Sequence, residues 1–367
     1  MISTKPRASA GNFLSNYTSG RDNNFTLLRF VAATCVLITH SFILSTGRPE
    51  TEPLGELLGI SLGTIAVHVF FVASGFLVTG SLLYRQSLRD FVVARFLRIY
   101  PGLWVALAVT VLVVGLFFTN LAIGTFLHHP ETLHYLARNA TLHRSIASTL
   151  PGAFGDVPYK DAVNGSLWTL PLEVRMYAML AGLWLMAKLA KVRNVSFFSA
   201  TCIVLAFFGI GGDLILFFQH KSSDFTNLGG MFFAGASLRV LQNRVPASPR
   251  LAWTLLGVLL AAAIFDRMVF GVIYRLTVPY LVMYFALVPG GFIRRFNALG
   301  DYSYGIYIYA FPVQQAVAYL WRGVQPYEMM MLSFLVTLFL SVASWHLIES
   351  RALGFKERLM KMRVPAA

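Results

Sequence analysis

Charged residues are scarce in this sequence of 367 residues. Asp, Glu, Lys and Arg make up 13% of the chain and hydrophobic residues 56%, whereas a soluble globular domain carries about 25% charged residues. So few charges cannot cover the surface of a water-soluble particle of this size. The composition therefore excludes the soluble classes and predicts an integral membrane protein.

Cysteine and several common site motifs are lacking as well. The two cysteines, Cys35 and Cys202, each lie in an apolar run, which excludes a disulfide framework and a thiolate metal site. There is no phosphate-binding glycine loop and no serine-hydrolase elbow. We expect no metal, because the histidines of one long segment lack ligand spacing: His128, His129, His134 and His143.

Long apolar runs are what the chain does have. A helix needs about 20 mostly apolar residues to cross the roughly 30 Å hydrocarbon layer, and ten runs approach that length, which predicts an all-α polytopic membrane protein. The runs are 25–45, 64–84, 99–119, 166–187, 196–218, 227–241, 251–265, 270–288, 302–321 and 329–348. The short pair at 227–241 and 251–265 also fits a single re-entrant hairpin.

The positive excess follows this topology. The chain has 30 Lys and Arg against 16 Asp and Glu, a formal net charge of +14. With a cytoplasmic N-terminus, 20 of the cations lie in inside segments and 8 in outside segments, as the positive-inside rule expects. Both termini are therefore expected in the cytoplasm, and no nucleic acid is needed to explain the charge.

The same topology divides the chain. We expect a cytoplasmic N-terminal tail at 1–24, a transmembrane domain at 25–350 and a basic cytoplasmic tail at 351–367. A long outside loop at 120–165 contains a moderately amphipathic stretch that suits the membrane surface.

Four titratable groups fall inside the predicted spans at a similar depth. His40, His68, Glu173 and Asp213 all lie within about 6 to 11 Å of the outer interface at 1.5 Å per residue. Such groups are costly in lipid and are candidates for a functional site. They predict a polar cavity that opens outward, although each also fits a side chain near a helix end that reaches for water.

Arg29 and His40 share one helix face. Eleven residues turn a helix through three turns and about 20°, so the two side chains lie on the same face about 16 Å apart along the axis. This arrangement suits a substrate that is anionic at its inner end and reactive at its outer end. As an alternative, Arg29 is a snorkelling positive-inside anchor.

Arg95 and Arg98 form a second pair, at the inner end of the span at 99–119. At i,i+3 they are neighbours on one helix face, and two guanidinium groups together suit a phosphate. Arginines that only anchor the helix on the cytoplasmic side would show the same spacing. Glu173, with Trp168 before it and Tyr177 one turn on, could orient an imidazole. Ser74 fits close helix packing better than a nucleophile.

Five ordered blocks over residues 23 to 350 resemble the acyltransferase-3 family of integral membrane acyltransferases. They are NNFTLLRFVAATCVLITHSF, HVFFVASGFLVTGSLL, ARFLRIYPGLW, NGSLWTLPLEVRMY and DYSYGIYIYAFPV. The resemblance implies transfer of an acyl group, usually acetyl, from cytoplasmic acyl-CoA to a hydroxyl of an extracytoplasmic carbohydrate, such as a cell-surface polysaccharide or exopolysaccharide. It also implies a multi-pass protein of the bacterial cytoplasmic membrane.

The family's motifs carry over residue by residue. Arg29 and His40 match its Arg-x10-His motif, and Arg95 and Arg98 match its arginine pair at the cytoplasmic mouth. We expect four aromatic residues of the later blocks to contact the substrate: Trp168, Tyr177, Tyr304 and Tyr307.

The sequence departs from the family at two places. Thr169 stands where the family has Ser, and the residues before Pro312 lack the His that often precedes that proline. Some members append a soluble hydrolase-like domain, whereas this chain stops about 17 residues past its last predicted span. We therefore expect it to work alone or with a separate extracytoplasmic partner.

These residues suggest a mechanism in which acyl-CoA docks from the cytoplasm with its phosphates on Arg95, Arg98 and Arg29. His40 either removes a proton from the acceptor hydroxyl or carries the acyl group itself. Glu173 is expected to orient the His40 imidazole or to balance its charge. Two alternatives stay open: an acyltransferase with a lipid or protein acceptor, and a transporter that uses the same cavity.

Overall fold

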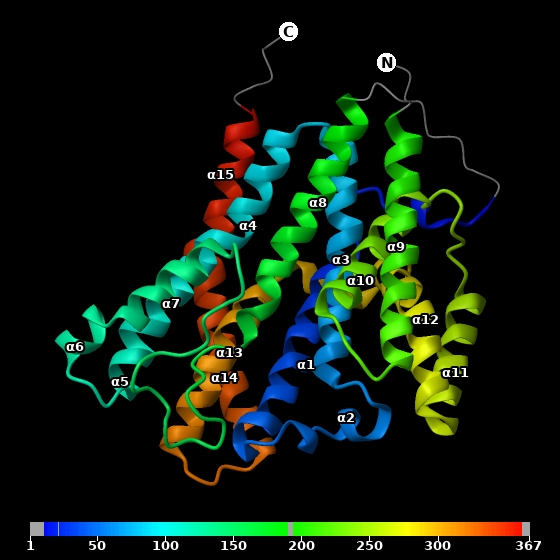
Figure 1. The fold of residues 1–367 in the computed structure, drawn as a ribbon. Coiled ribbons are helices and arrows are strands. Elements are labelled where there is room, and N and C mark those ends of the chain that lie inside the picture. The colour runs from blue at the N-terminus through cyan, green and yellow to red at the C-terminus, as the bar shows by residue number, and fades with distance from the viewer. Residues whose placement is uncertain (1–10, 21, 190–193, 362–367) are drawn as a thin grey trace.

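The computed structural model describes residues 11–20, 22–189 and 194–361, and this part of the chain is helical with no strand beyond isolated bridges (Figure 1). Seven helical stretches in it are long and apolar enough to cross a membrane. They contain α1 (Phe25–Thr46), α3 (Leu62–Arg85), α4 (Leu88–Val109), α8 (Leu170–Leu189), α9 (Asn194–Phe218), α12 (Arg267–Leu287) and α14 (Pro326–Ser344).

The three remaining predicted runs are helices too. They are α10 (Asp224–Val240), α11 (Pro249–Phe265) and α13 (Ser303–Leu320). All ten predicted runs thus form helices, and the all-α polytopic prediction is confirmed. The two short helices are not arms of one hairpin, because α10 packs mainly on α3 and α9 whereas α11 packs on α12.

Short elements connect and extend these helices. Two π turns, η3 (Thr110–Gly115) and η6 (Trp345–Glu349), continue α4 into α5 (Leu116–Phe118) and α14 into α15 (Ser350–Lys361). The others are η1 (Leu14–Tyr17), η2 (Pro49–Thr51), α2 (Pro53–Leu58), α6 (Ile123–His128), α7 (Pro130–Thr141), η4 (Ser166–Thr169) and η5 (Phe292–Ala298).

Helix α4 begins eleven residues before the predicted span at 99–119. Ser87 caps it, because the Ser87 side chain accepts a hydrogen bond from the Asp90 backbone N–H, and Ser is among the best residues at that position. Arg95 and Arg98 therefore lie within the helix, which begins earlier than the predicted span.

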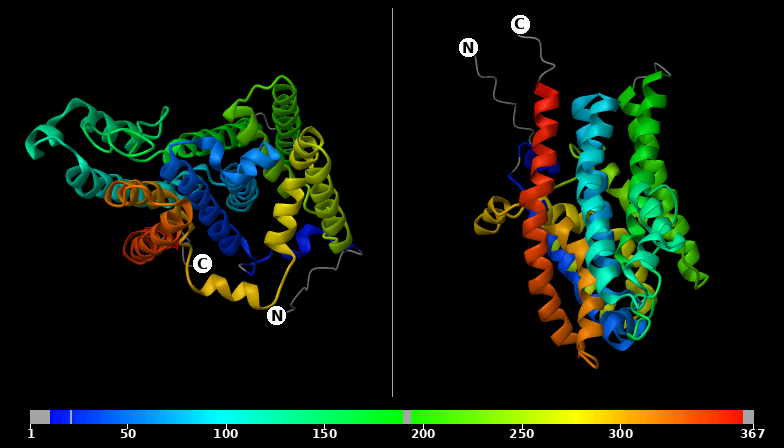
Figure 2. Two further views of the ribbon diagram at one scale, coloured as in Figure 1. Left: turned by 90° about the horizontal axis from the view of Figure 1, so that it is seen from below. Right: turned by 90° about the vertical axis from the view of Figure 1, so that its left-hand side faces the viewer.

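The long loop at 120–165 folds back against the bundle. The side chains of Tyr100 and Trp104 on α4 donate hydrogen bonds to the carbonyls of Thr141 and Ala140 at the end of α7, at 3.2 and 3.0 Å. The view from below in Figure 2 shows α6 and α7 standing out to one side of the ring of helices.

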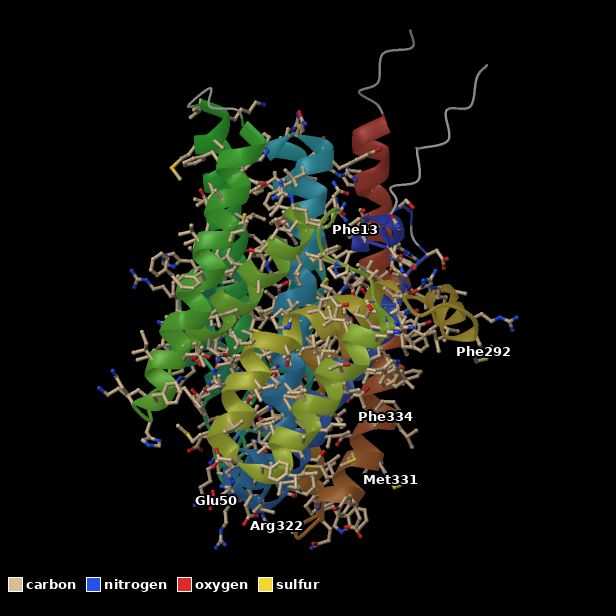
Figure 3. All side chains as sticks on the ribbon, turned by 90° about the vertical axis from the view of Figure 1, so that its right-hand side faces the viewer. Phe13, Glu50, Phe292, Arg322, Met331 and Phe334 are labelled. Atoms are coloured by element: carbon tan, nitrogen blue, oxygen red, sulfur yellow. The ribbon has the colours of Figure 1, made fainter. Side chains whose placement is uncertain are left out.

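The arrangement agrees with a membrane protein whose ends share one side. In Figure 1, α15 ends at the top of the bundle, and α1 begins near mid-height with its first residues on the upper side. Large apolar side chains point outward, as Met331 and Phe292 do in Figure 3, where they are 71% and 78% exposed. The cytoplasmic placement of that end stays a prediction.

The centre of the bundle depends on glycine contacts between α3 and α10. A Cβ atom at Gly75 would lie 1.9 Å from the Phe232 carbonyl oxygen, and one at Gly235 would lie 2.0 Å from that of Val72. The two backbones touch at both points, so only glycine fits. This contact holds α3 in place and explains the SGF sequence beside Ser74 as a packing motif.

We predict that Gly75→Ala destabilises the protein by about 1 to 3 kcal/mol or more, because the added methyl group must push two backbones apart. Thermal unfolding of the purified protein in detergent measures this effect. Gly182→Ala on α8 is the matched control, since a Cβ atom there meets nothing within 4 Å. Equal unfolding temperatures for the two variants would contradict the packing account.

Candidate functional site

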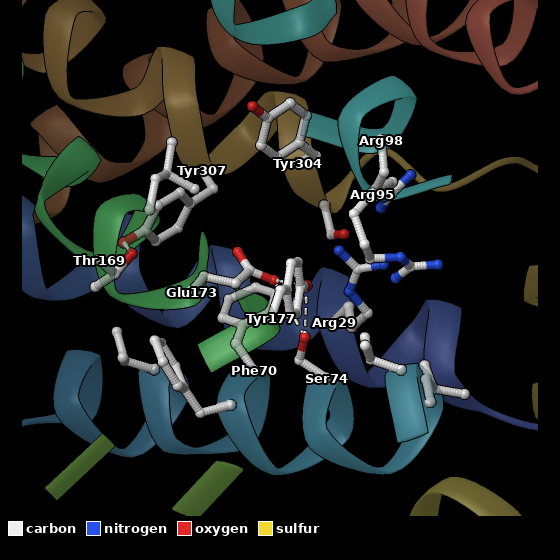
Figure 4. Close-up of a pocket in the computed structure, with 16 residues that line it drawn as sticks. Arg29, Phe70, Ser74, Arg95, Arg98, Thr169, Glu173, Tyr177, Tyr304 and Tyr307 are labelled. Atoms are coloured by element: carbon white, nitrogen blue, oxygen red, sulfur yellow. Dashed lines mark hydrogen bonds between the residues drawn. The ribbon is translucent and has the colours of Figure 1, made fainter. Parts of the chain in front are cut away.

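A pocket lies at the centre of the bundle, where α1, α3, α4, α8 and α13 meet (Figure 4). One wall is apolar and comes mostly from α3, and the other is polar and charged. The polar lining consists of Arg29, Ser74, Arg95, Arg98, Thr169, Glu173, Tyr177, Ser303, Tyr304 and Tyr307. The pocket thus collects most of the residues that the sequence predicted, from helices far apart in the chain.

Asp301 joins two of the pocket's arginines. Its Oδ2 atom accepts a hydrogen bond from Arg29 at 2.7 Å and another from Arg98 at 2.5 Å. The other oxygen, Oδ1, accepts from the Ser303 hydroxyl at 2.5 Å. One carboxylate before α13 therefore ties the first turns of α1 to the middle of α4.

The two guanidiniums keep this carboxylate ionised. Burial raises the pKa of the Asp301 carboxyl, but the positive charges of Arg29 and Arg98 outweigh burial, so that its pKa lies well below the ordinary value. A depressed pKa means that the bridge contributes stability at neutral pH and loses it only in strong acid.

Arg95 differs from the other two arginines. Its guanidinium lies 5.8 Å from the centroid of the Tyr177 ring, and it forms no ion pair within the described residues. Its Nε atom is buried and has no hydrogen-bond partner. A buried donor without a partner is rare in a folded protein, so this side chain has capacity left for a ligand.

Glu173 makes its contacts inside the pocket. Its Oε1 atom accepts a hydrogen bond from Ser74 Oγ at 3.2 Å and another from the Tyr177 hydroxyl, and the two hydroxyls lie 2.7 Å apart. The expected contact with His40 is wrong, because Glu173 faces α3 at Ser74. Ser74 accordingly holds a carboxylate in place in addition to lying in a packing motif.

His40 lies outside the pocket. Its ring packs edge-on against Phe311 at 5.2 Å between centroids, and Phe311 follows Tyr307, which lines the pocket, by one turn of α13. The Nδ1 atom of His40 is buried without a hydrogen-bond partner. His40 therefore lies one turn of α13 beyond the charged pocket, with one ring nitrogen that has no partner in the described chain.

Three of the four aromatic residues that were expected to contact the substrate lie in the pocket. Tyr177, Tyr304 and Tyr307 line the pocket, whereas Trp168 does not and is 39% exposed. Tyr304 donates to the Ile99 carbonyl at 2.7 Å, and Tyr307 lies 2.6 Å from the Thr169 hydroxyl. Thr169 thus supplies a hydroxyl where the family has Ser.

His68 and Asp213 do not share this pocket, so the predicted common cavity with His40 and Glu173 is wrong. Asn227 links them: its Oδ1 atom lies 2.5 Å from His68 Nε2, and its amide donates to Asp213 at 2.9 Å. Arg275 donates to the same carboxylate at 2.6 Å, and the Tyr274 hydroxyl lies 2.8 Å from His68 Nδ1. These buried groups are mutually satisfied, as in a structural network.

Asp301 is a site residue that the sequence analysis missed. It lies one residue before a predicted span, where an acidic residue looks like part of a solvated loop. The available signal was the pattern Asp-x-Ser, since an Asp side chain can accept the backbone N–H two residues on, as Asp301 does from Ser303 at 3.3 Å.

Comparisons with known proteins find matches over most of the chain. A family described as "Acyltransferase domain", the acyltransferase-3 type, matches residues 22–348. An O-acetyl transferase of Shigella phage Sf6 is 30% identical over 91% of this chain and 96% of its own length. Nodulation protein 10 of Rhizobium leguminosarum bv. viciae is 27% identical over 96% and 99%.

A further relative is longer than this chain. A putative peptidoglycan O-acetyltransferase of Bacillus subtilis is 25% identical over 80% of this chain and 51% of its own length. No solved structure matches.

We predict that Asp213→Ala lowers the free energy of unfolding by about 3 to 5 kcal/mol, because it leaves the buried Arg275 guanidinium without its partner. Thermal unfolding in detergent measures the loss. Asp156→Ala is the control, since Asp156 pairs with Arg322 at 3.9 Å on the surface and its loss costs less than about 1 kcal/mol. A small effect at both positions would show that the His68 network is not structural.

Proposed function

The chain belongs to the acyltransferase-3 family, and from this premise we propose that it moves an acetyl group from cytoplasmic acyl-CoA to a hydroxyl of an extracytoplasmic carbohydrate. It is an O-acetyltransferase and a multi-pass membrane protein. The donor, the sidedness and the acceptor are the proposed parts. The observation that carries the proposal is the pocket that Arg29, Arg95 and Arg98 line, with His40 outside it against Phe311.

The arginines support an anionic donor. Guanidinium groups bind phosphate oxygens through paired N–H donors, and the three come from α1 and α4 to one cavity. An acyl-CoA carries its phosphates at one end and its thioester at the other. Because Arg29, which lines the pocket, and His40 are eleven residues apart on α1, about 16 Å along the axis, an extended pantetheine arm can span from the pocket to the imidazole.

His40 supports the transfer step. In direct transfer, the imidazole takes the proton of the acceptor hydroxyl while its oxygen bonds to the thioester carbon; the carbon–sulfur bond then breaks, and CoA leaves as the thiolate. In covalent transfer, a ring nitrogen bonds to the thioester carbon and the CoA thiolate leaves; the acceptor oxygen then bonds to the acyl carbon, the carbon–nitrogen bond breaks, and the imidazole takes the hydroxyl proton. The free Nδ1 atom suits either route.

Glu173 is proposed to balance charge and not to orient His40. Its carboxylate is fixed by Ser74 and Tyr177 in a pocket that also holds three arginines. A fixed negative charge there lowers the electrostatic cost of gathering the cations before the donor arrives.

A carbohydrate acceptor is favoured by the relatives, two of which carry peptidoglycan O-acetyltransferase in their names. The acceptor can be identified by comparing the masses of cell-surface glycans from cells with and without the gene. We expect glycans heavier by one acetyl group only when the gene is present. Label from radioactive acetyl-CoA in lipid extracts, with none in the glycan, would favour a lipid acceptor instead.

We predict that His40→Ala lowers acetyl transfer about 100-fold or more, as loss of a general base or nucleophile does, while the protein stays folded and inserted. The measurement is release of CoA and labelling of glycan by membranes that contain each variant. His128→Ala is the control, because His128 is exposed and its ring bonds only a nearby backbone carbonyl. Wild-type rates in His40→Ala would remove His40 from the mechanism.

A further inference from the structure

The three arginines of the pocket are not equivalent. Arg29 and Arg98 both donate to Asp301, so their nearest guanidinium N–H groups are already used by a carboxylate of this chain. Their side chains are 23% and 15% exposed, and that of Asp301 is 17% exposed. The trio is therefore a largely buried, hydrogen-bonded unit before any ligand arrives.

Such a unit has a structural purpose of its own. Two like charges held close together in a medium of low dielectric repel strongly, and a carboxylate between them removes that cost. Asp301 is in turn held by the Ser303 hydroxyl and backbone N–H. The bridge thus fastens α1, α4 and the start of α13 together, and its charges are committed to one another.

Arg95 has no such partner. The carboxylate that shares the pocket, Glu173, is bonded to Ser74 and Tyr177 and receives no hydrogen bond from an arginine in the described chain. The Arg95 guanidinium lies over the Tyr177 ring, and its Nε–H has no acceptor. The Arg95 guanidinium thus pairs with no carboxylate in the described chain, and at least one of its buried donors has no acceptor.

We propose that Arg95 alone provides the primary contact with an anionic group of the donor, while Asp301 makes Arg29 and Arg98 a structural clamp. The inference rests on the proposed function, because it takes the donor to be a phosphate-bearing acyl thioester. The sequence presents Arg95 and Arg98 as two equal arginines. The inference makes Arg95 a ligand-binding residue and Arg98 a structural residue.

Acetyl-CoA binding by the purified full-length protein in lipid nanodiscs tests the first half. Arg95→Gln should raise the dissociation constant for acetyl-CoA about tenfold or more, the loss expected for a charge-assisted hydrogen bond, with an unchanged unfolding temperature. Arg95→Lys should recover part of the binding, because it keeps the charge but not the planar fork. Arg29→Gln should raise the dissociation constant by a smaller factor than Arg95→Gln does.

Thermal unfolding tests the second half. Arg29→Gln and Asp301→Asn should each lower the unfolding temperature. The variant with both substitutions should lower it by less than the sum of the two single shifts, because both changes break the same bridge. Arg95→Gln combined with Asp301→Asn should lower it no more than Asp301→Asn alone. Asp22→Asn is the control. The Asp22 side chain pairs with Arg294 but is 72% exposed, so this substitution should have little effect on the unfolding temperature.

The outcomes separate the inference from the function. Binding by the wild type, with equal losses in Arg95→Gln and Arg29→Gln, would overturn the division of roles and leave the donor proposal standing. Additive losses of unfolding temperature in Arg29→Gln and Asp301→Asn would overturn the clamp. No binding of acetyl-CoA by the wild type would overturn the donor proposal and, with it, the role of Arg95.

Discussion

The site depends on the need to hold positive charges together inside a membrane protein. A lone guanidinium in the bilayer is costly, and three in one cavity need negative charge close by. Asp301 supplies it to Arg29 and Arg98 through hydrogen bonds of 2.7 and 2.5 Å. Because these residues come from α1, α4 and the segment before α13, the charge balance also fixes how the three helices meet.

The rest of the site follows from this meeting point. Helix α1 carries Arg29 into the pocket and His40 about three turns after Arg29, so one rigid element sets the distance between the pocket and the imidazole. On the opposite side, α3 is held by glycine contacts with α10 and brings Ser74 to Glu173. A second buried network, around Asp213 and Arg275, fastens α9 to α12 and leaves the pocket to the residues that bind and react.

Periodicity and hydropathy were enough to predict the helices, because crossing a membrane imposes a length and a composition that the sequence displays openly. Arg29, Arg95 and Arg98 were predictable as a set for the same reason, since cations in such a chain are conspicuous. The partners of Glu173 and Asp213 were not predictable. Both carboxylates looked alike along the chain, and only packing decides that one faces Ser74 and the other Arg275. Asp301 was missed because its burial comes from three helices distant in sequence.

The most direct test is acetyl transfer across a sealed membrane. Vesicles that contain the purified protein are loaded with peptidoglycan fragments or another surface glycan, and labelled acetyl-CoA is added outside, to the face that bears the arginine end of the protein. We expect labelled acetyl groups on the enclosed glycan, with CoA released outside in equal amount. Release of CoA outside with label confined to that same side would contradict a reaction that crosses the membrane.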